Sequence, residues 1–171
     1  VQSSEKEKFD GVMLDIEPYI SDSWKENPEE YMDRYISCMK KGYKFAQKNH
    51  LRTGICIPRH YDNQGLTSGL EELIKETCDE VAVMNYSCGN EIEAIRTEAA
   101  LSEKYGKELH CILEFQEVGK HGLTENKTYR NKGIDNAKET WEKLQKEYKN
   151  INVTRDYHWS RPVREMLEEK N

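Results

Sequence analysis

Residues 9–19 read FDGVMLDIEPY. The run is rich in aliphatic residues and ends at Pro18, which is typical of a buried strand. Two carboxylates, Asp15 and Glu17, stand at alternate positions inside it, although charged side chains are rarely buried without a partner. The stretch therefore predicts a strand over residues 10–17 whose carboxyl end opens into a solvent-filled site.

The two faces of this strand differ in character, because side chains alternate along a strand. One face carries both carboxylates together with Gly11 and Met13. The other face is mostly aliphatic and is expected to pack against helices; it carries Asp10, Val12, Leu14 and Ile16.

A strand followed by a helix recurs along the rest of the chain. The clearest helix begins at Pro28, where Asn27 can serve as its N-cap. The expected strands are 10–17, 52–57, 80–86, 108–115 and 151–157. The expected helices are 28 to about 50, 67–78, 90–105, 133–149 and 161–169.

This alternation indicates an α/β fold with a parallel sheet and external helices. An open doubly wound sheet and a (β/α)8 barrel of the TIM-barrel type are the two competing architectures. Residues 17–24, EPYISDSW, follow the first strand in place of a glycine-rich phosphate loop, which argues against a nucleotide-binding open sheet. Polar residues end every expected strand, as they do in barrel enzymes. The barrel is therefore the predicted fold.

The length of the chain limits this prediction. A full barrel takes about 250 residues, whereas this chain has 171. We expect residues 1–171 to form a single catalytic-type domain that supplies about five β/α units, the C-terminal part of a barrel. The first three units would be missing, removed or supplied by a second chain, and a partial barrel alone would expose long sheet edges.

Composition excludes several classes of protein. Charged residues make up 34% of the chain, hydrophobic residues 36%, and the formal net charge is −6. This balance indicates a soluble domain and gives no reason to expect a nucleic-acid or anionic-membrane partner. No segment approaches the roughly 20 apolar residues of a membrane span, and the first ten residues do not resemble a signal peptide.

Cysteine and histidine give no sign of a disulfide framework or a metal site. The five cysteines form no CxxC pair, and the five histidines show no HxH or HExxH spacing. We expect most of the cysteines to be buried thiols. Neither a metal nor a cofactor is predicted.

The carboxylate pair suggests acid–base chemistry. Two carboxylates about 7 Å apart along one strand repel each other, so the more buried one should keep its proton to higher pH. A general acid beside an ionised partner has this property, and glycoside hydrolysis uses such a pair. The alternative is that both acids are solvated or paired with arginine, for instance Arg59 or Arg155.

FDGVMLDIE resembles the fourth-strand signature DGxDxDxE of the chitinase-like glycoside hydrolases of family 18. Asp10, Gly11, Asp15 and Glu17 match that signature. VMNYS at 83–87 is similar to the Met-x-Tyr motif of the family's sixth strand, and HWS at 158–160 lies where the eighth strand ends in a tryptophan. The resemblance spans essentially the whole chain and implies that its strands are the fourth to the eighth of the barrel.

The resemblance implies hydrolysis of β-linked N-acetylhexosamine glycans by a retaining, substrate-assisted mechanism. Glu17 would protonate the leaving oxygen, Asp15 would orient the N-acetyl group that attacks the anomeric carbon, and Tyr86 would hydrogen-bond the same group. Trp159 would form the floor of the sugar site. Further contacts to the oligosaccharide or polysaccharide are expected from other residues at strand ends, namely His60, Met84, Asn85, Glu114 and Gln116. Such an enzyme would act mostly outside the cell or in the cell envelope.

Met13 is the main departure from the family pattern. It stands where the family has an acid that shares a proton with the next aspartate, a role that methionine cannot fill. Three alternatives therefore stay open: another DxE-type barrel glycosidase, a non-catalytic carbohydrate-binding barrel, and an assembly module whose edges pair with another chain.

Overall fold

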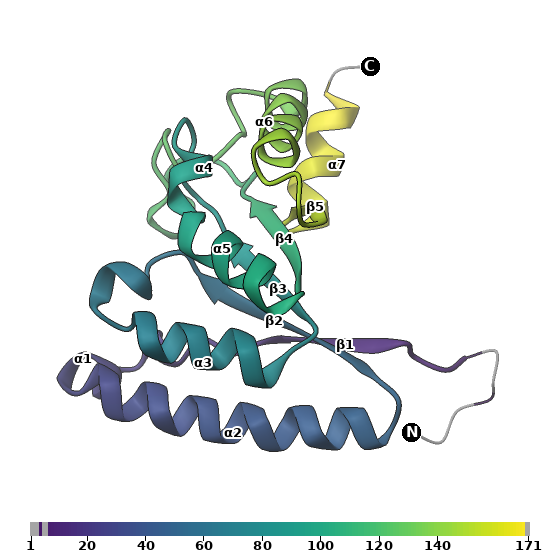
Figure 1. Ribbon diagram of the computed structural model, residues 1–171. Helices are drawn as coiled ribbons and strands as arrows, with labels where there is room; N and C mark the ends of the chain where they lie inside the picture. Colours follow the sequence, from purple (N-terminus) through teal and green to yellow (C-terminus); the bar gives the residue numbers. More distant parts are fainter. Residues whose placement is uncertain (1–3, 5–6, 170–171) are drawn as a thin grey trace.

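The strands of the molecule lie side by side in the order in which they occur along the chain (Figure 1). The computed structural model describes residue 4 and residues 7–169, and within them five strands form one sheet in which all neighbours are parallel. The strands are β1 (Gly11–Asp15), β2 (Arg52–Pro58), β3 (Glu80–Met84), β4 (Glu108–Leu113) and β5 (Val153–Tyr157). All five carboxyl ends therefore meet at the same end of the sheet.

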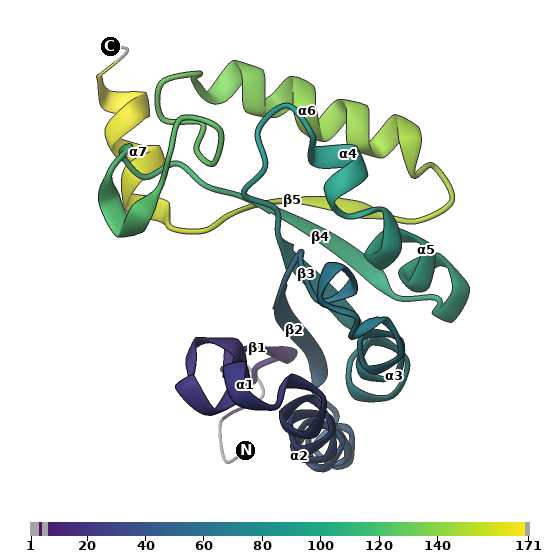
Figure 2. The ribbon, with the colours of Figure 1, turned by 90° about the vertical axis from the view of Figure 1, so that its left-hand side faces the viewer.

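Seven α-helices connect or follow these strands within the described residues. They are α1 (Asp22–Glu26), α2 (Pro28–Lys48), α3 (Thr67–Thr77), α4 (Glu91–Ala94), α5 (Arg96–Tyr105), α6 (Ile134–Glu147) and α7 (Ser160–Glu168). Three 3-10 turns lie in the loops: η1 (Pro18–Ile20), η2 (Asp62–Gln64) and η3 (Lys120–Gly122). The helices follow one another around one face of the sheet, with α2 against α3 and α3 against α5 (Figure 2).

The main core lies between this face and the helices. Alternate strand residues point into it and are fully buried; they include Ile55, Ile57, Val81, Val83, Leu109 and Leu113. Burying one such side chain stabilises the fold by about 1.5–3 kcal/mol. The second face carries only a small cluster of Cys56, Ala82 and Ile112, with Met84 and Tyr86 packed beside it.

The register of the sheet sets which side chains share the second face. Asp15 pairs with Cys56, Cys56 with Ala82, Ala82 with His110, and His110 with Thr154. Residues two positions later in each strand form the next layer towards the carboxyl ends. Because of this register, Asp15, Tyr86 and His158, which lie at or just after the ends of β1, β3 and β5, are on the same face of the sheet.

The long helix after β1 begins as its sequence predicts. Pro28 occupies its first turn, and the side chain of Asn27 accepts a hydrogen bond of 3.4 Å from the backbone N–H of Glu30. Other boundaries differ. The helix expected at 90–105 is divided at Ile95, which leaves helical geometry (φ −125°, ψ 18°) with its side chain fully buried. The short helix α1, capped by Ser21, was not expected.

The aliphatic face of β1 is only partly buried, contrary to the sequence prediction. Leu14 packs against the main core, but Val12 is 38% exposed and Ile16 is 46% exposed. The reason is that β1 is an edge strand. The other edge strand, β5, exposes 48% of Tyr157. This α/β architecture, with two open edges in the part described, is consistent with part of an α/β barrel.

None of the helices in the described part of the chain is long and apolar enough to cross a membrane.

Gly11 provides a test of the β1–β2 pairing. A Cβ atom at this position would lie 2.8 Å from the backbone carbonyl oxygen of Arg52, so one strand would have to shift. We expect Gly11→Ala to lower the free energy of unfolding by about 1–3 kcal/mol, measured by urea denaturation.

The matched control is Gly42→Ala in α2, where nothing lies within 4 Å of the added Cβ atom. Alanine favours a helix interior over glycine by about 1 kcal/mol, so this variant should be more stable than the parent. Equal effects of the two substitutions would contradict the close approach of β1 to β2.

Candidate functional site

A cavity of about 300 Å³ lies at the carboxyl end of the sheet, on the second face. The ends of β1, β2 and β3 supply most of its lining, and single residues come from the loop after β4 and from the end of β5. The lining residues are Asp15, Glu17, Tyr19, Pro58, Arg59, His60, Met84, Tyr86, Lys127 and His158. The three residues predicted to be catalytic, Asp15, Glu17 and Tyr86, therefore meet in one place.

Asp15 holds its proton to higher pH than an ordinary aspartate. Partial burial raises the pKa of its carboxyl, and the negative charge of Glu17 raises it further. His158, which lines the same cavity, acts in the opposite direction and lowers it. The ionisation of Asp15 is thus set by two charged neighbours of opposite sign.

Glu17 is held by the tyrosine that follows it two positions later. The hydroxyl of Tyr19 donates a hydrogen bond to Glu17 Oε1. Burial and this bond raise the pKa of Tyr19 above its ordinary value, so Tyr19 remains a donor. Its ring packs edge-on against His60, with 5.2 Å between ring centroids. Tyr19 is not predictable from the sequence, because a tyrosine after a strand-ending proline has no distinguishing pattern.

His60 reaches the cavity from the loop after β2, as its sequence position predicts. Burial lowers its pKa, and the neighbouring Arg59 lowers it further, so the imidazole is neutral at pH 7. It can therefore donate or accept a hydrogen bond without adding charge. Its role in substrate binding stays a prediction.

Tyr86 presents a buried hydroxyl that has no hydrogen-bond partner among the described residues. Burial, followed by the charges of Glu114 and Asp15, raises its pKa, so the hydroxyl stays protonated. A buried polar group without a partner is costly in a folded protein. This donor is consequently available to a ligand in the cavity.

Glu114 is nearly completely buried and is hydrogen-bonded to its neighbours instead of facing the cavity. Its Oε1 accepts the backbone N–H groups of Phe115 and Gln116, both at 2.8 Å. Its Oε2 lies 2.7 Å from His158 Nδ1 and 3.0 Å from the amide nitrogen of Gln116. Both carboxylate oxygens of Glu114 thus already have partners within the protein, and a contact from Glu114 to sugar hydroxyls stays a prediction.

The Glu114 carboxylate fixes the charge and orientation of His158. Burial alone would raise the pKa of Glu114, but the hydrogen bonds from His158 and Gln116 outweigh it and hold the pKa below its ordinary value. The same bond raises the pKa of His158. His158 Nδ1 is engaged, which leaves Nε2 for the cavity. The ring of Tyr86 lies 5.8 Å from that of His158.

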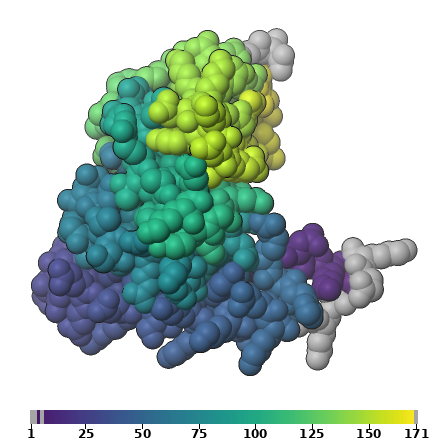
Figure 3. Space-filling model, viewed as in Figure 1, coloured from purple at the N-terminus to yellow at the C-terminus, as the bar shows by residue number. Residues whose placement is uncertain are grey.

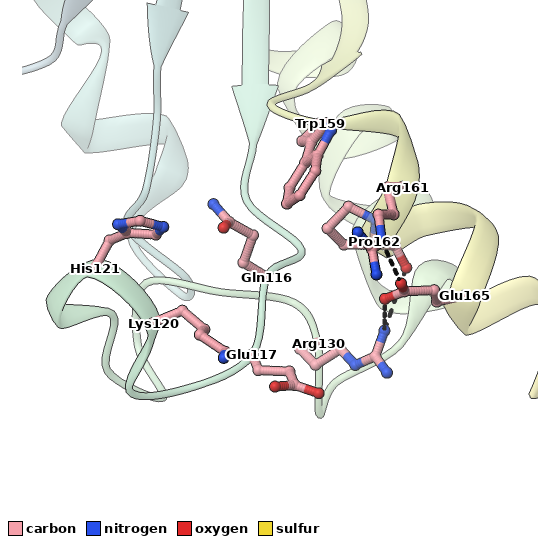
Figure 4. Close-up of a pocket in the computed structure, with 9 residues that line it drawn as sticks. All are labelled: Gln116, Glu117, Lys120, His121, Arg130, Trp159, Arg161, Pro162 and Glu165. Carbon is pink, nitrogen blue, oxygen red and sulfur yellow. Dashed lines mark hydrogen bonds and ion pairs between the residues drawn. The ribbon is translucent and has the colours of Figure 1, made fainter.

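Two residues from the sequence motifs lie elsewhere. Asn85 is 1% exposed and donates a 2.9 Å hydrogen bond to the backbone carbonyl of Glu91, on the helix side of the sheet. Asn85 lies on the face opposite to the cavity because one step along the strand reverses the face, and its role in sugar binding stays a prediction. Trp159 lines a different cavity together with Gln116 (Figure 4), because the chain turns into α7 directly after β5.

Met84 lines the cavity, whereas Met13 does not. Met13 lies over Gly54, where an added Cβ atom would be 2.5 Å from the methionine sulfur. The methionine therefore fills the space that the missing side chain of Gly54 leaves. The position that carries an acid in the family signature is occupied here by an uncharged thioether.

One group in the described part of the chain has the residue types of a metal site. Glu80, Glu108 and His110 lie at the opposite end of the sheet, with ligand atoms within 4.8 Å of one another. Arg52 already bridges both glutamates, at 2.6 Å from Glu80 and 3.1 Å from Glu108. Asp156 accepts a 2.7 Å bond from His110. These contacts make the group an ion-pair cluster.

The chain matches no protein-family model, no curated protein and no solved structure.

The two histidines of the cavity should titrate on opposite sides of the ordinary histidine pKa. We expect NMR titration of the ring protons to give His158 a pKa above about 6.5 and His60 a pKa below it. Glu114→Gln should bring the pKa of His158 down, because the hydrogen-bonded carboxylate is lost, and should leave His60 unchanged. An unchanged His158 in this variant would contradict the Glu114–His158 pairing.

Proposed function

We propose that this chain carries the catalytic site of a retaining glycoside hydrolase that cleaves β-linked N-acetylhexosamine glycans, as the chitinase-like family 18 enzymes do. The observation that carries the proposal is the single cavity lined by Asp15, Glu17 and Tyr86 at the carboxyl end of a parallel sheet. In α/β barrels this end holds the active site.

The proposal includes a barrel of the TIM type, of which these five β/α units are the fourth to the eighth. Three features support it: the strands keep their chain order, the helices cover one face, and both outer strands are open among the described residues. An open doubly wound sheet would instead reverse its strand order at a switch point.

Glu17 is the proposed proton donor to the leaving glycosidic oxygen. Asp15 orients the substrate's N-acetyl group, whose carbonyl oxygen attacks the anomeric carbon, and stabilises the positive charge of the resulting oxazolinium ion. The free hydroxyl of Tyr86 donates a hydrogen bond to the same acetamido group. In this mechanism no side chain of the protein forms a covalent bond to the sugar. It is therefore the substrate-assisted exception to the two-carboxylate scheme.

His158 favours the ionised form of Asp15, for which Met13 offers no proton-sharing partner. Asp15 must be ionised when the oxazolinium ion forms, yet burial and Glu17 both favour its protonated form. The imidazolium of His158, held by Glu114, lowers the pKa of Asp15. We therefore assign His158 as a positioning and charge-balancing residue for Asp15.

A non-catalytic carbohydrate-binding barrel is the second candidate, and the position of Met13 over Gly54 favours it. Such a protein would bind the same glycans in the cavity but would not turn them over. Binding and hydrolysis must therefore be measured separately.

The decisive substitution is Glu17→Gln. It keeps the shape of the side chain but removes the proton donor, so we expect hydrolysis of N-acetylglucosamine oligomers to fall by about 10²–10⁴-fold. Binding of the oligomers, measured by calorimetry, should persist. The control is Glu26→Gln, at the exposed end of α1.

Two results would contradict this assignment. Hydrolysis at the parent rate by Glu17→Gln would exclude Glu17 as the acid, and no hydrolysis by the parent protein would favour the binding barrel. A thiazoline mimic of the oxazolinium ion should inhibit competitively; failure to inhibit an active parent would favour a carboxylate nucleophile.

The pH profile tests the role of His158. Removing its charge in His158→Gln raises the pKa of Asp15, so the acid limb of the kcat profile should move to higher pH. If His158→Gln loses rate without moving the acid limb, His158 has a merely structural role.

A further inference from the structure

One fully buried carboxyl group has no role in the proposed chemistry. Glu98, in the first turn of α5, is 0% exposed, and neither of its oxygens has a hydrogen-bond partner in another described residue. Burying an ionised carboxylate without a partner is costly, so such a side chain keeps its proton to higher pH. Glu98 is therefore a neutral acid in the interior of the protein.

The protonation equilibrium of Glu98 lies near neutral pH. Its pKa is raised to about 7, chiefly by burial. The backbone N–H of the residue itself lowers the pKa, the charge of Asp62 raises it, and the charge of Arg59 lowers it. The carboxyl group thus loses its proton in a range in which an ordinary glutamate is already ionised.

Both charged neighbours of Glu98 belong to the β2–α3 loop, residues 59–66. This loop reaches the candidate active cavity, because Arg59 lines it. The loop also contacts α5, since the hydroxyl of Thr97 donates a 2.8 Å hydrogen bond to Asp62 Oδ2. α5 packs beside α3, the helix into which the loop continues (Figure 3). Glu98 therefore lies where α5 meets a loop of the active cavity.

The other elements around α5 give Glu98 no ion partner in the described part of the chain. On α3, Glu71 binds Lys104 at 2.6 Å, near the opposite end of α5. Tyr148, which follows α6, has a pKa that burial raises, with a smaller contribution from the charge of Glu98. β4 presents buried side chains to the helices, namely Leu109, Cys111 and Leu113. Any response to ionisation of Glu98 is thus left to the loop.

Two forces act on the loop when Glu98 is ionised. The half-buried Arg59 makes no hydrogen bond or ion pair to the described residues, so its guanidinium is free to be attracted. This attraction is strong where water is excluded. The Asp62 carboxylate, which accepts hydrogen bonds from Thr97 and from the backbone N–H of Asn63, is repelled. Both forces displace the same loop.

We propose that Glu98 is a positioning residue that makes the candidate active site sensitive to pH. As a neutral acid it allows the β2–α3 loop to rest on α5, with Arg59 and His60 at the cavity. As a carboxylate, after its proton has passed to solvent, it draws Arg59 away from the cavity and weakens the contact of Asp62 with α5. That this loop serves a glycan site rests on the function proposed above. The site should therefore bind its glycan less tightly at alkaline than at slightly acidic pH.

NMR can follow this change without a substrate. The backbone N–H of Asn63 donates to Asp62 Oδ1 at 2.7 Å, so its chemical shift reports the state of the loop. We expect this shift to inflect near pH 7 in the parent protein. Glu98→Gln keeps the shape of the neutral acid but cannot ionise, so the inflection should disappear. His60 titrates at lower pH in both proteins, because its own pKa is lowered.

The pH dependence of stability gives a second measurement. Because the pKa of Glu98 is raised in the folded state, stability is lost as the pH rises from the ordinary glutamate pKa to the raised value. In urea denaturation, the unfolding equilibrium constant of the parent should gain on the order of 10²-fold from this group between about pH 4.5 and 7. Glu98→Gln should lack this gain, and so should Glu98→Met, which removes both buried oxygens. The control is Glu103→Gln, at an exposed position of the same helix, which should keep it.

Glycan affinity links Glu98 to the site. In protein that carries Glu17→Gln to prevent turnover, binding of an N-acetylglucosamine tetramer should weaken by roughly tenfold between pH 6 and pH 8, as measured by calorimetry. Adding Glu98→Gln should remove most of this loss, and the remainder is the titration of His158. Adding Glu103→Gln should leave the loss as it was.

The outcomes separate this device from the proposed catalysis. An inflection of Asn63 near pH 7 that persists in Glu98→Gln, or that the parent lacks, would overturn the role of Glu98. A pH dependence of unfolding that is equal in the parent and in both Glu98 variants would do the same. An affinity that falls equally with and without Glu98→Gln would overturn the link to the site. If the protein binds no glycan, the proposed function fails, and the NMR and unfolding data still decide whether Glu98 controls the loop.

Discussion

The in-register pairing of five parallel strands determines which side chains of this protein can meet. Because neighbouring residues point to opposite faces, a shift of one position would move Asp15 to the helix side and exchange Tyr86 for Asn85. In the observed register, Asp15 shares a layer with Cys56 and Ala82, and Tyr86 follows β3 on the same face. The helices bury the opposite face. The second face thus holds Asp15, Glu17 and Tyr86 at the carboxyl ends of their strands, where they line one cavity.

Glu114 links the architecture to the chemistry of that cavity. It is buried at the end of β4 and accepts bonds from two backbone N–H groups, from Gln116 and from His158. Its own pKa is lowered, so its bonds stabilise the fold above the ordinary glutamate pKa, and this contribution is lost as the pH falls through the lowered value. The raised pKa of His158 gives a contribution that is present below the ordinary histidine pKa and is lost as the pH rises through the raised value. The pair therefore stabilises the fold most between about pH 4.5 and 6.5.

Local sequence patterns predicted the order and type of the main elements, because strands and helix ends depend on interactions between residues close in sequence. Examples are the aliphatic run that ends at Pro18 and the helix start at Asn27 and Pro28. A third is Gly106, whose left-handed φ of 63° ends α5. The separation of α4 from α5 at Ile95 accompanies burial of that side chain, which a short sequence pattern does not predict. The exposure of Val12 and Ile16 follows from the edge position of β1. For the site, the placement of Asp15, Glu17, Tyr86 and His60 followed from strand ends. Lys127 and the Glu114–His158 bond depend on tertiary contacts, whereas the local Tyr19–Glu17 bond follows no distinguishing pattern. The sequence motifs do not specify on which face Asn85 and Trp159 lie beyond the strand end.

The stereochemistry of the first product tests the proposed mechanism most directly. Substrate assistance by the N-acetyl group involves two inversions at the anomeric carbon, so the product released from a β-linked N-acetylglucosamine oligomer must be the β anomer before mutarotation. Proton NMR of a freshly started hydrolysis distinguishes the two anomers. Initial β product that disappears in Glu17→Gln is the predicted result. Initial α product would show an inverting mechanism with a water nucleophile, and would contradict the roles assigned here to Asp15 and Tyr86.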